Sequence, residues 1–328
     1  MPQVDTILNR SDHIGTIGAR TGIQRDKYTI TPGLYCVGWP TADSPVLITA
    51  NYKLTFDALR HELGGVDAWI LVVDTRGINV WCAAGRGTFS TEEIAYQVQR
   101  ARLVDVVTHR ELILPQCGAP GVSALKLKTA CGFKGIFGPI RATDIKAFLA
   151  SGKAADETMR SVTFNLKERA VLIPLELFLL LKPLVLTLAC LVLFSGFGPD
   201  LYSLDRALQR GGNIAIVTII SIFSGAVLLP LLLPWMPGRQ FWVKGMFLGI
   251  WVGIFTVQHF FPSVGWTAVT GMAVWAMSVN SFLAMNFTGS TPYTSLSGVE
   301  MEMRKGLAIQ IVFALSGLLC WLAGPFLL

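Results

Sequence analysis

Charged residues are scarce in this 328-residue sequence: Asp, Glu, Lys and Arg together make up 15%, against 52% hydrophobic residues. The mean hydropathy is +0.54. Ordinary soluble domains carry about 25% charged residues, so part of this chain is expected to lie in lipid. The shortage is uneven, because residues 1–165 have a globular composition and nearly everything after residue 170 is hydrophobic. We therefore expect a soluble half followed by a membrane half.

Paired cysteine motifs are also lacking. The six cysteines are scattered without CxxC spacing, which is neither a zinc pattern nor a disulfide framework. The formal net charge of +6 comes without a basic run interleaved with aromatic residues, so nucleic-acid binding is not expected. The first twenty residues lack the apolar core and cleavage site of a secretory signal. This predicts a cytoplasmic soluble half.

In the soluble half, short β-branched runs alternate with helical patterns. Residues 68–74 (AWILVVD) form an apolar run that ends in an acid, typical of a strand buried on both faces of a parallel sheet. Ser90 and Glu93 predict a capping box for a helix that runs to about residue 103. Further strands are expected at residues 34–39, 46–50, 111–114 and 133–137, and further helices at 56–63, 121–131 and 143–150. The alternation predicts a Rossmann-like α/β domain over residues 1–160, with its ligand beyond the carboxyl ends of the strands.

The membrane half follows a polar linker at residues 161–170. Five apolar stretches are each long enough to cross a bilayer core of about 30 Å: residues 171–197, 214–235, 241–261, 264–287 and 307–328. They predict an all-α transmembrane domain of about five helices over residues 171–328. The positive-inside rule places the basic residues that flank these stretches in the cytoplasm, and the carboxyl terminus outside the cytoplasmic membrane: Lys167, Arg169, Arg239, Lys244, Arg304 and Lys305. Arg206 and Arg210, in the first outer loop, count against this topology.

Two ionisable residues, Glu176 and Lys182, lie within the first apolar stretch. Charged groups inside a membrane are costly and often functional. The alternative is that this stretch begins as an interfacial helix, with Glu176 at headgroup level and Lys182 extended toward the headgroups. The sequence leaves both interpretations open.

The most informative segment is GINVWCAAGRGTF, residues 77–89, directly after the predicted buried strand. A thiol at Cys82 has a large aromatic residue on one side and two alanines and two glycines on the other. The backbone beyond Cys82 therefore has little side-chain bulk to keep a flat ligand away. The alternative is a buried structural cysteine in a tight connection, since free cysteine is often buried.

The pattern NVWCAAG-basic-G resembles the signature of the corrinoid protein of the bacterial and archaeal mercury-methylation pair. In that family the cysteine is the lower axial ligand of cobalt. Further similar stretches extend the resemblance over most of the chain: PGLYCVGWPTADSPVLITANYKLTFDALR, GAPGV, FGPIRATDIKAFL and FTGSTPYTSLSGVE. The soluble half alone also resembles the corrinoid-binding domain of the corrinoid iron–sulfur protein large subunit, a methyl carrier of the acetyl-CoA pathway. That relative lacks both the thiolate ligand and the membrane tail.

Two departures from the mercury-methylation family stand out. The family motif ordinarily ends in glycine-lysine where this chain has Gly85-Arg86, which replaces a flexible ammonium with a planar guanidinium. The family is also expected to have a histidine at a position near Leu125, where this chain has none. Both departures leave room for a paralogue that binds corrinoid but acts on something else.

The resemblance implies a corrinoid-dependent methyltransferase that passes a methyl group from Cys-ligated cobalt to Hg(II), giving methylmercury. A thiolate trans to the methyl group donates electron density, which favours transfer to a soft electrophile. The implied partners are a small ferredoxin-type iron–sulfur protein as electron donor, a methyl donor from one-carbon metabolism, Hg(II) as substrate and the lipid bilayer. Cys82 is the expected catalytic residue and cobalt ligand. The expected corrinoid-binding residues lie at the ends of strands: Thr49, Asn51, Asn79, Val80, Trp81, Cys82, Ala83, Ala84, Gly85, Arg86, Gly87, Gly118, Pro120 and Gly121.

Two other functions compete with this interpretation. One is a membrane-tethered methyl carrier for one-carbon metabolism or another acceptor, which Arg86 in place of lysine encourages. The other is a small transporter or sensor with a cytoplasmic ligand-binding domain. The few polar groups within the apolar stretches make a poor substrate pathway, which disfavours the transporter.

Overall fold

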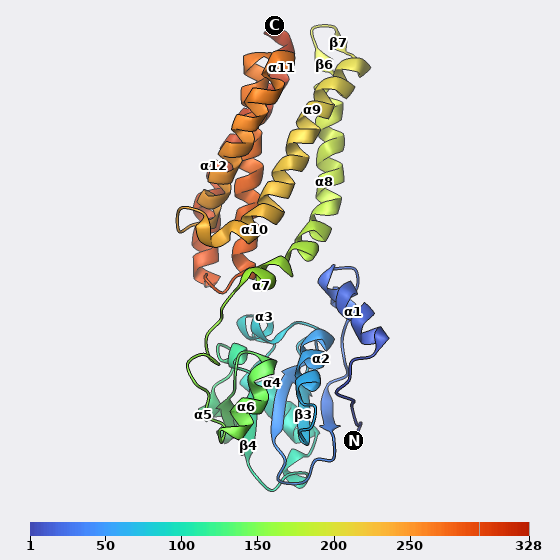
Figure 1. The fold of residues 1–328 in the computed structure, drawn as a ribbon, viewed down its shortest axis with the longest axis vertical. Helices are drawn as coiled ribbons and strands as arrows, with labels where there is room; N and C mark the ends of the chain where they lie inside the picture. Colours follow the sequence, from blue (N-terminus) through green and yellow to red (C-terminus); the bar gives the residue numbers. More distant parts are fainter. Residues whose placement is uncertain (295, 328) are drawn as a thin grey trace. The chain divides into compact units, whose positions relative to one another are not determined.

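The chain folds into two compact units, Met1–Thr163 and Phe164–Leu328. The computed structural model describes residues 1–294 and 296–327. The first unit is an α/β domain and the second is helical (Figure 1).

A five-stranded sheet forms the centre of the first unit, in the order β1-β3-β2-β4-β5. The strands are β1 (Gly33–Val37), β2 (Val46–Ala50), β3 (Ala68–Val73), β4 (Glu111–Leu114) and β5 (Lys134–Phe137). β2, β3, β4 and β5 pair in parallel, as the alternating pattern predicts. β1 instead runs antiparallel to β3, with Gly33 opposite Val72 and Val37 opposite Ala68. The parallel α/β sheet is therefore present, with an antiparallel edge strand that the sequence did not indicate.

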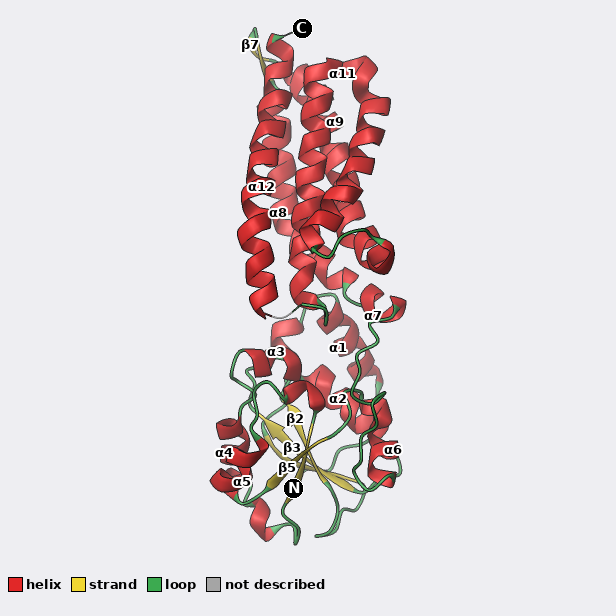
Figure 2. Ribbon diagram, turned by 90° about the vertical axis from the view of Figure 1, so that its left-hand side faces the viewer, coloured by secondary structure: helices red, strands yellow, loops and turns green. Residues whose placement is uncertain are grey.

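Helices cover both faces of this sheet (Figure 2). Successive side chains of a strand point to opposite faces, so Leu71 and Val73 enter one hydrophobic core while Ile70 and Val72 enter the other. The first core is closed by helices from the middle of the unit, and the second by helices that follow β2 and β5. These helices are α3 (Val80–Gly85), α4 (Thr91–Arg100), α5 (Ala124–Cys131), α2 (Lys53–Glu62) and α6 (Ile145–Ala150).

The start of α4 bears out only half of the predicted capping box. Ser90 caps the helix, because its Oγ accepts from the backbone N–H of Glu93 at 3.2 Å. The Glu93 carboxylate does not close the box; it accepts from the backbone N–H of Asp74 at 3.0 Å. Glu93 therefore ties α4 to the end of β3, a tertiary contact that the local sequence pattern does not reveal.

A buried charge cluster fastens the amino-terminal helix α1 (Arg10–Arg20) to α2. Asp12 lies 2.6 Å from Lys53 Nζ and 2.7 Å from Arg60 Nη2. Lys53 and Arg60 also pair with Asp57, at 2.6 and 2.7 Å. Gly15 packs so closely on Tyr28 that a Cβ would collide with the ring. This contact fixes α1 on the unit.

Acid is expected to weaken this attachment. Burial raises the pKa of Asp12. Hydrogen bonds from Lys53, from the backbone N–H of Asn9 and from Arg60 outweigh that effect and lower the pKa from 3.8 to about 2. Because the folded-state pKa lies below the unfolded one, the carboxylate stabilises the fold above pH 3.8, and this contribution is lost as the pH falls through about 2. A shift of this size corresponds to about 2 kcal/mol.

Urea unfolding of the wild type, Asp12→Asn and Asp26→Asn at pH 5 and near pH 2 measures this effect. Asp26 is exposed and serves as the control. We expect the unfolding free energy to fall with acid by about 2 kcal/mol less in Asp12→Asn than in the other two proteins. Equal losses in all three would contradict the assignment.

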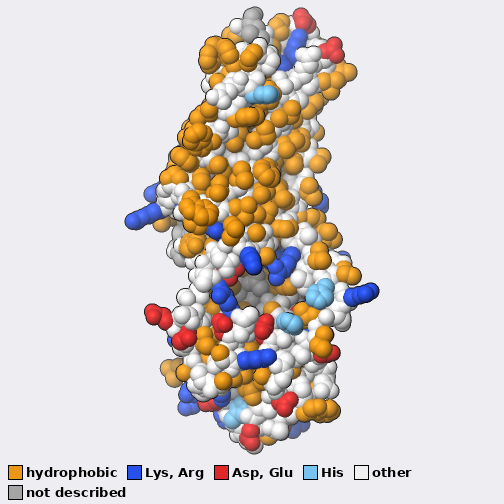
Figure 3. All heavy atoms as spheres, viewed as in Figure 1, with side chains coloured by type: hydrophobic (Ala, Val, Ile, Leu, Met, Phe, Trp, Pro, Cys, Tyr) orange, Lys and Arg blue, Asp and Glu red, His pale blue; other side chains and the backbone are white. Residues whose placement is uncertain are grey.

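The second unit consists of long apolar helices. Four helical segments in the described chain are long and apolar enough to cross a membrane: Leu166–Ser195, Leu204–Trp235, Phe241–Ser290 and Ser297–Phe326. Their helices are α7 (Leu166–Ala170), α8 (Ile173–Ser195), α9 (Leu204–Phe223), α10 (Leu229–Leu232), α11 (Phe241–Phe287) and α12 (Leu296–Ala323), with a short hairpin of β6 (Phe197–Gly198) and β7 (Leu201–Tyr202). On the face that Figure 3 draws, hydrophobic side chains cover most of this unit, and most of the charged side chains lie on the α/β unit.

The helix α11 is interrupted at Gly265, whose φ of 75° and ψ of 171° are not helical. Residues before and after the break lie against each other. A Cβ on Gly249 would lie 2.6 Å from Met277 Cα, and one on Gly253 would lie 3.3 Å from Ala273 Cβ. The contact partner moves back along the chain as the glycine moves forward, so the two halves run in opposite directions. Small residues at such contacts let membrane helices approach closely.

The ionisable residues of the first apolar stretch both belong to α8. Glu176 is half-buried and Lys182 is exposed. The chain enters α8 through the short α7, which Asn165 and Glu168 cap reciprocally. Because α7 precedes the apolar stretch and both ionisable residues fall within the continuous helix α8, the two interpretations of Glu176 and Lys182 stay open.

Candidate functional site

The candidate site lies where the parallel strands end. Because β2 and β3 are parallel and pair Ala50 with Val73, the residues that follow them come to the same edge of the sheet. There Asn51 Nδ2 donates to Asp74 Oδ1 at 3.0 Å. This is the edge at which the sequence predicts a ligand.

Asn51 organises the loop that follows β3. Its Oδ1 accepts from the backbone N–H groups of Thr75 and Gly77, at 3.0 and 2.9 Å. The side chain is only 7% exposed, and the donor and acceptor atoms of its amide are both engaged with the loop. Asn51 therefore holds the loop in this structure. Asp74 and Thr75, its partners, were not among the residues expected from the sequence.

The loop leads into α3, which carries Cys82. The N-cap residue is Asn79, whose Oδ1 accepts from the backbone N–H of Cys82 at 2.9 Å. Cys82 is exposed, and its neighbour Trp81 is 44% exposed. The sequence predicts a connection at this point, and the structure has one and a half turns of helix that present the thiol to solvent.

The small residues after Cys82 do not all lie beside the thiol. Ala83 and Ala84 are 0% and 5% exposed and belong to the first core with Val80. The helical repeat accounts for this placement, because residues 80, 83 and 84 share one side of α3 and residues 81 and 82 do not. The expectation that both alanines leave room for a flat ligand is therefore corrected, because their side chains pack into the hydrophobic core. Gly85, Arg86 and Gly87 are the exposed continuation.

The segment Gly118–Gly121 packs against α3 and the residues after it. A Cβ at Gly121 would collide with the carbonyl oxygen of Phe89 and lie 3.0 Å from Ala84 Cα, and one at Gly118 would lie 2.5 Å from the Phe89 ring. These glycines are needed for close approach. The backbone N–H groups of residues 118, 119 and 121 donate to the carbonyls of Pro115, Gln116 and Gly118. They support α3, and they are not free to hold ligand amides in this geometry.

The two remaining expected residues are divided between the sheet and the margin of the site. Thr49 is 2% exposed and lies within β2, opposite Val72. Pro120 is exposed beside the packed glycines. Leu125, near the position where the resembled family has a histidine, is 78% exposed on α5. The structure thus brings the Cys82 segment, Asn51 and the Gly118–Gly121 segment to one edge, while Thr49 stays in the sheet.

The first unit contains four cysteines, all of them described. Cys82 is exposed, whereas Cys36, Cys117 and Cys131 are half-buried. Burial raises the pKa of the Cys117 and Cys131 thiols above the usual value. A thiol binds metal as the thiolate, so both are poor ligands near neutral pH. Cys82 is the accessible thiol at the ligand edge.

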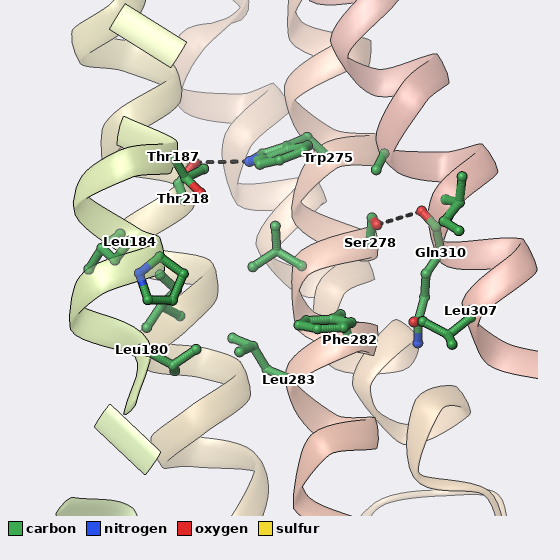
Figure 4. Close-up of a pocket in the computed structure, with 15 residues that line it drawn as sticks. Leu180, Leu184, Thr187, Thr218, Trp275, Ser278, Phe282, Leu283, Leu307 and Gln310 are labelled. Atoms are coloured by element: carbon green, nitrogen blue, oxygen red, sulfur yellow. Dashed lines mark hydrogen bonds between the residues drawn. The ribbon is translucent and has the colours of Figure 1, made fainter. Parts of the chain in front are cut away.

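A separate cavity of about 300 Å³ lies among α8, α9, α11 and α12 of the second unit (Figure 4). Trp275 Nε1 donates to Thr218 Oγ1 at 2.9 Å, and Ser278 Oγ donates to the Gln310 carbonyl at 2.8 Å. The rest of the lining is mostly aliphatic and aromatic, and none of its fifteen described residues is titratable. It offers no group for acid–base chemistry.

Comparison with known proteins gives matches to the first unit. Residues 19–149 match the family model described as CO dehydrogenase/acetyl-CoA synthase delta subunit. The chain is 32% identical over 139 residues to the acetyl-CoA decarbonylase/synthase complex subunit gamma of Archaeoglobus fulgidus, which covers 41% of this chain and 29% of that protein. It is 32% identical over 121 residues to the corrinoid/iron-sulfur protein large subunit of Moorella thermoacetica, covering 36% of this chain and 27% of that protein.

The chain therefore spans less than a third of the length of these relatives. The family match includes the sheet, α3 with Cys82 and the Gly118–Gly121 segment, and it ends before the second unit. The α/β unit is similar in sequence to a subunit of an acetyl-CoA decarbonylase/synthase complex and to a protein that is by name a corrinoid/iron-sulfur protein.

Proposed function

We propose that the α/β unit binds a corrinoid, and that the Cys82 thiolate would be the protein ligand of its cobalt. The observation that carries this proposal is the exposed thiol of Cys82 on α3, at the edge where parallel α/β sheets bind ligands. A relative named as a corrinoid protein matches this unit. When bound, a corrinoid supplies a cobalt centre that accepts a methyl group and passes it on.

The residues around Cys82 fit a broad, flat group. The exposed surface of α3 continues from Trp81 and Cys82 to Gly85 and Gly87, which add no bulk. Asn79 fixes the backbone at Cys82, and Asn51 fixes the loop before it. The segment Gly118–Gly121 packs against α3 and Phe89. The backbone that carries the Cys82 thiol is therefore positioned by hydrogen bonds and packing within the protein. These contacts do not depend on the ligand, as a preorganised site requires.

We infer that the methyl acceptor is Hg(II) and the product methylmercury. The support is the NVWCAAG-basic-G motif and the chemistry of a soft, strongly donating thiolate, which favours transfer to a soft metal ion. This function needs a small ferredoxin-type iron–sulfur protein to reduce cobalt and a methyl donor from one-carbon metabolism. A second candidate, a membrane-tethered methyl carrier for one-carbon metabolism, is favoured by the relatives that are named as an acetyl-CoA decarbonylase/synthase subunit and as a corrinoid/iron-sulfur protein.

The exchange Arg86→Lys tests the choice between these acceptors. Cells that express the chain with a ferredoxin partner are given Hg(II), and methylmercury is measured. We expect the wild type to form methylmercury and Arg86→Lys to form as much or more, because lysine restores the residue of the resembled family. Arg100→Lys on the exposed end of α4 is the control and is expected to equal the wild type. If neither the wild type nor Arg86→Lys forms methylmercury, the one-carbon carrier replaces the mercury assignment.

We further propose that the second unit crosses the cytoplasmic membrane five times, with α11 contributing two crossings. Its chain direction reverses at Gly265, and each half is long enough to span. Basic residues such as Lys167, Arg239 and Arg304 lie near the proposed cytoplasmic ends of the crossings, as the positive-inside rule requires. This places the α/β unit in the cytoplasm and the carboxyl terminus outside.

Alkaline phosphatase fusions distinguish five crossings from four. The enzyme is active only outside the cytoplasm, so a fusion at the carboxyl terminus is expected to be active. A fusion after Ser290, at the end of η7 (Thr288–Ser290), is expected to be inactive. A fluorescent protein fused at the carboxyl terminus is the complementary reporter. If the phosphatase fusion is inactive there and the fluorescent fusion is fluorescent, the number of crossings is even.

A further inference from the structure

The helix α1 presents an apolar side that the fold does not use. Its buried residues are Asp12, Gly15 and Ala19, which contact the rest of the unit. On the outward side Ile14 and Ile17 are 67% and 63% exposed. The adjoining loops add Ile7 and Ile23, which are 73% and 69% exposed. We call these four residues the isoleucine face. Scattered exposed side chains are ordinary, but four isoleucines on one short segment mark an interaction surface.

Cations lie at both ends of α1 and just after it. Arg10 and Arg20 are at the two ends of α1, and Arg25 and Lys27 form η1 (Arg25–Lys27) just beyond it. Exposed acids in this segment are limited to Asp5 and Asp26, because Asp12 is paired with Lys53 and Arg60. An apolar side bordered by Lys and Arg is the pattern of a helix that lies in the interface of an anionic membrane.

The isoleucine face is held rigidly at the Cys82 edge of the unit. The charge cluster with Lys53 and Arg60 fixes α1, and the chain after η1 forms a bridge from Thr29 to Tyr52 beside Asn51. The side chain of Thr29 also lies against Gly77, which precedes α3. Nearly all of α1 lies before residue 19, where the family match begins. Ile7, Ile14 and Ile17 therefore precede the matched residues, whereas Ile23 lies among them, and the segment that carries the face contacts the ligand edge.

We propose that the isoleucine face docks into the interfacial layer of the membrane, with the neighbouring cations on anionic lipid headgroups. Such docking holds the α/β unit with its Cys82 edge at the bilayer surface. The chain's own membrane helices keep the unit near lipid, so a modest affinity suffices because the second contact is intramolecular. This inference rests on the proposed membrane location of the second unit and is independent of the methyl acceptor.

Photocrosslinking of the full chain tests this docking. A p-benzoyl-phenylalanine is placed at Ile17, and as a control at Val104, which is 53% exposed in η2 (Leu103–Asp105). Each protein is reconstituted into nanodiscs of phosphatidylcholine alone or mixed equally with phosphatidylglycerol. Mass spectrometry then identifies the adduct formed on illumination.

We expect position 17 to crosslink to lipid, with a yield several-fold higher in the anionic nanodiscs than in phosphatidylcholine, and position 104 to give little lipid adduct. The double exchange Arg10→Gln with Arg20→Gln should remove most of the dependence on anionic lipid. An adduct from position 17 to a peptide of a second chain, or a lipid yield equal to that of position 104, would overturn the docking. A chain that does not enter nanodiscs would instead overturn the membrane location itself.

Discussion

Exchange of Cys82 for alanine is expected to abolish methyl transfer while the fold and the amount of bound corrinoid stay nearly unchanged. The Cys82 side chain is exposed and adds little to the core, so its loss removes little packing. The backbone N–H of Cys82 still donates to Asn79, which keeps the start of α3 intact. What is lost is the sulfur donor to the metal. Activity is measured as methylmercury formed from Hg(II), and bound corrinoid by its visible absorption.

Two further variants make this result specific. Cys82→His keeps a ligand of weaker donation and should transfer methyl measurably, but much more slowly than the wild type. Cys36→Ala removes a half-buried thiol on the edge strand β1 and should behave as the wild type. Full activity of Cys82→Ala would exclude the sulfur ligand.

The second large effect is expected at Asn51. Exchange for leucine leaves two backbone N–H groups without their acceptor, that of the buried Thr75 and that of the half-buried Gly77. Each unsatisfied buried donor costs about 1–3 kcal/mol, so the unfolding free energy of the first unit should fall by about 2–5 kcal/mol. Because this loop positions α3, corrinoid binding should fall with it. Urea unfolding and cofactor titration measure the two effects.

Asn79→Ala is the graded comparison for Asn51→Leu. It removes one helix cap and should cost about 1 kcal/mol. The loop held by Asn51 does not depend on that cap. If Asn51→Leu proves no more destabilising than Asn79→Ala, the loop is held by other contacts and the role assigned to Asn51 is wrong.

The fold of the first unit was largely predictable because its central strands are buried on both faces. A short apolar run such as AWILVVD, bounded by turn residues, is typical of a buried strand and too short for most helices. The direction of β1 was not predictable, since the sequence of a short strand does not show whether its neighbour is parallel or antiparallel. The role of Glu93 was missed for a similar reason, because its partner is 19 residues away at the end of β3.

The site was predictable in its location more than in its detail. Strand ends identified Asn51, the Cys82 segment and Gly118–Gly121, and all three lie at one edge. The sequence did not show that Ala83 and Ala84 face the core, because that depends on α3 being helical. The one local signal was Asn79, a favoured N-cap residue, three residues before the thiol.

The membrane half illustrates a different limit. The apolar pattern separates residues 241–261 from 264–287, and the structure has a non-helical Gly265 close to that division. Hydropathy alone cannot say whether such a break bends a helix or reverses it. Close contacts of Gly249 and Gly253 with the second half supply that answer.

Cobalt X-ray absorption on the purified full chain tests the proposed sulfur ligation most directly. We expect corrinoid absorption bands and a sulfur atom bonded to cobalt in the wild type. In Cys82→Ala we expect the same cobalt content without that sulfur. Absence of corrinoid from the wild type, or sulfur ligation that persists in Cys82→Ala, would contradict the assignment of Cys82 as the cobalt ligand.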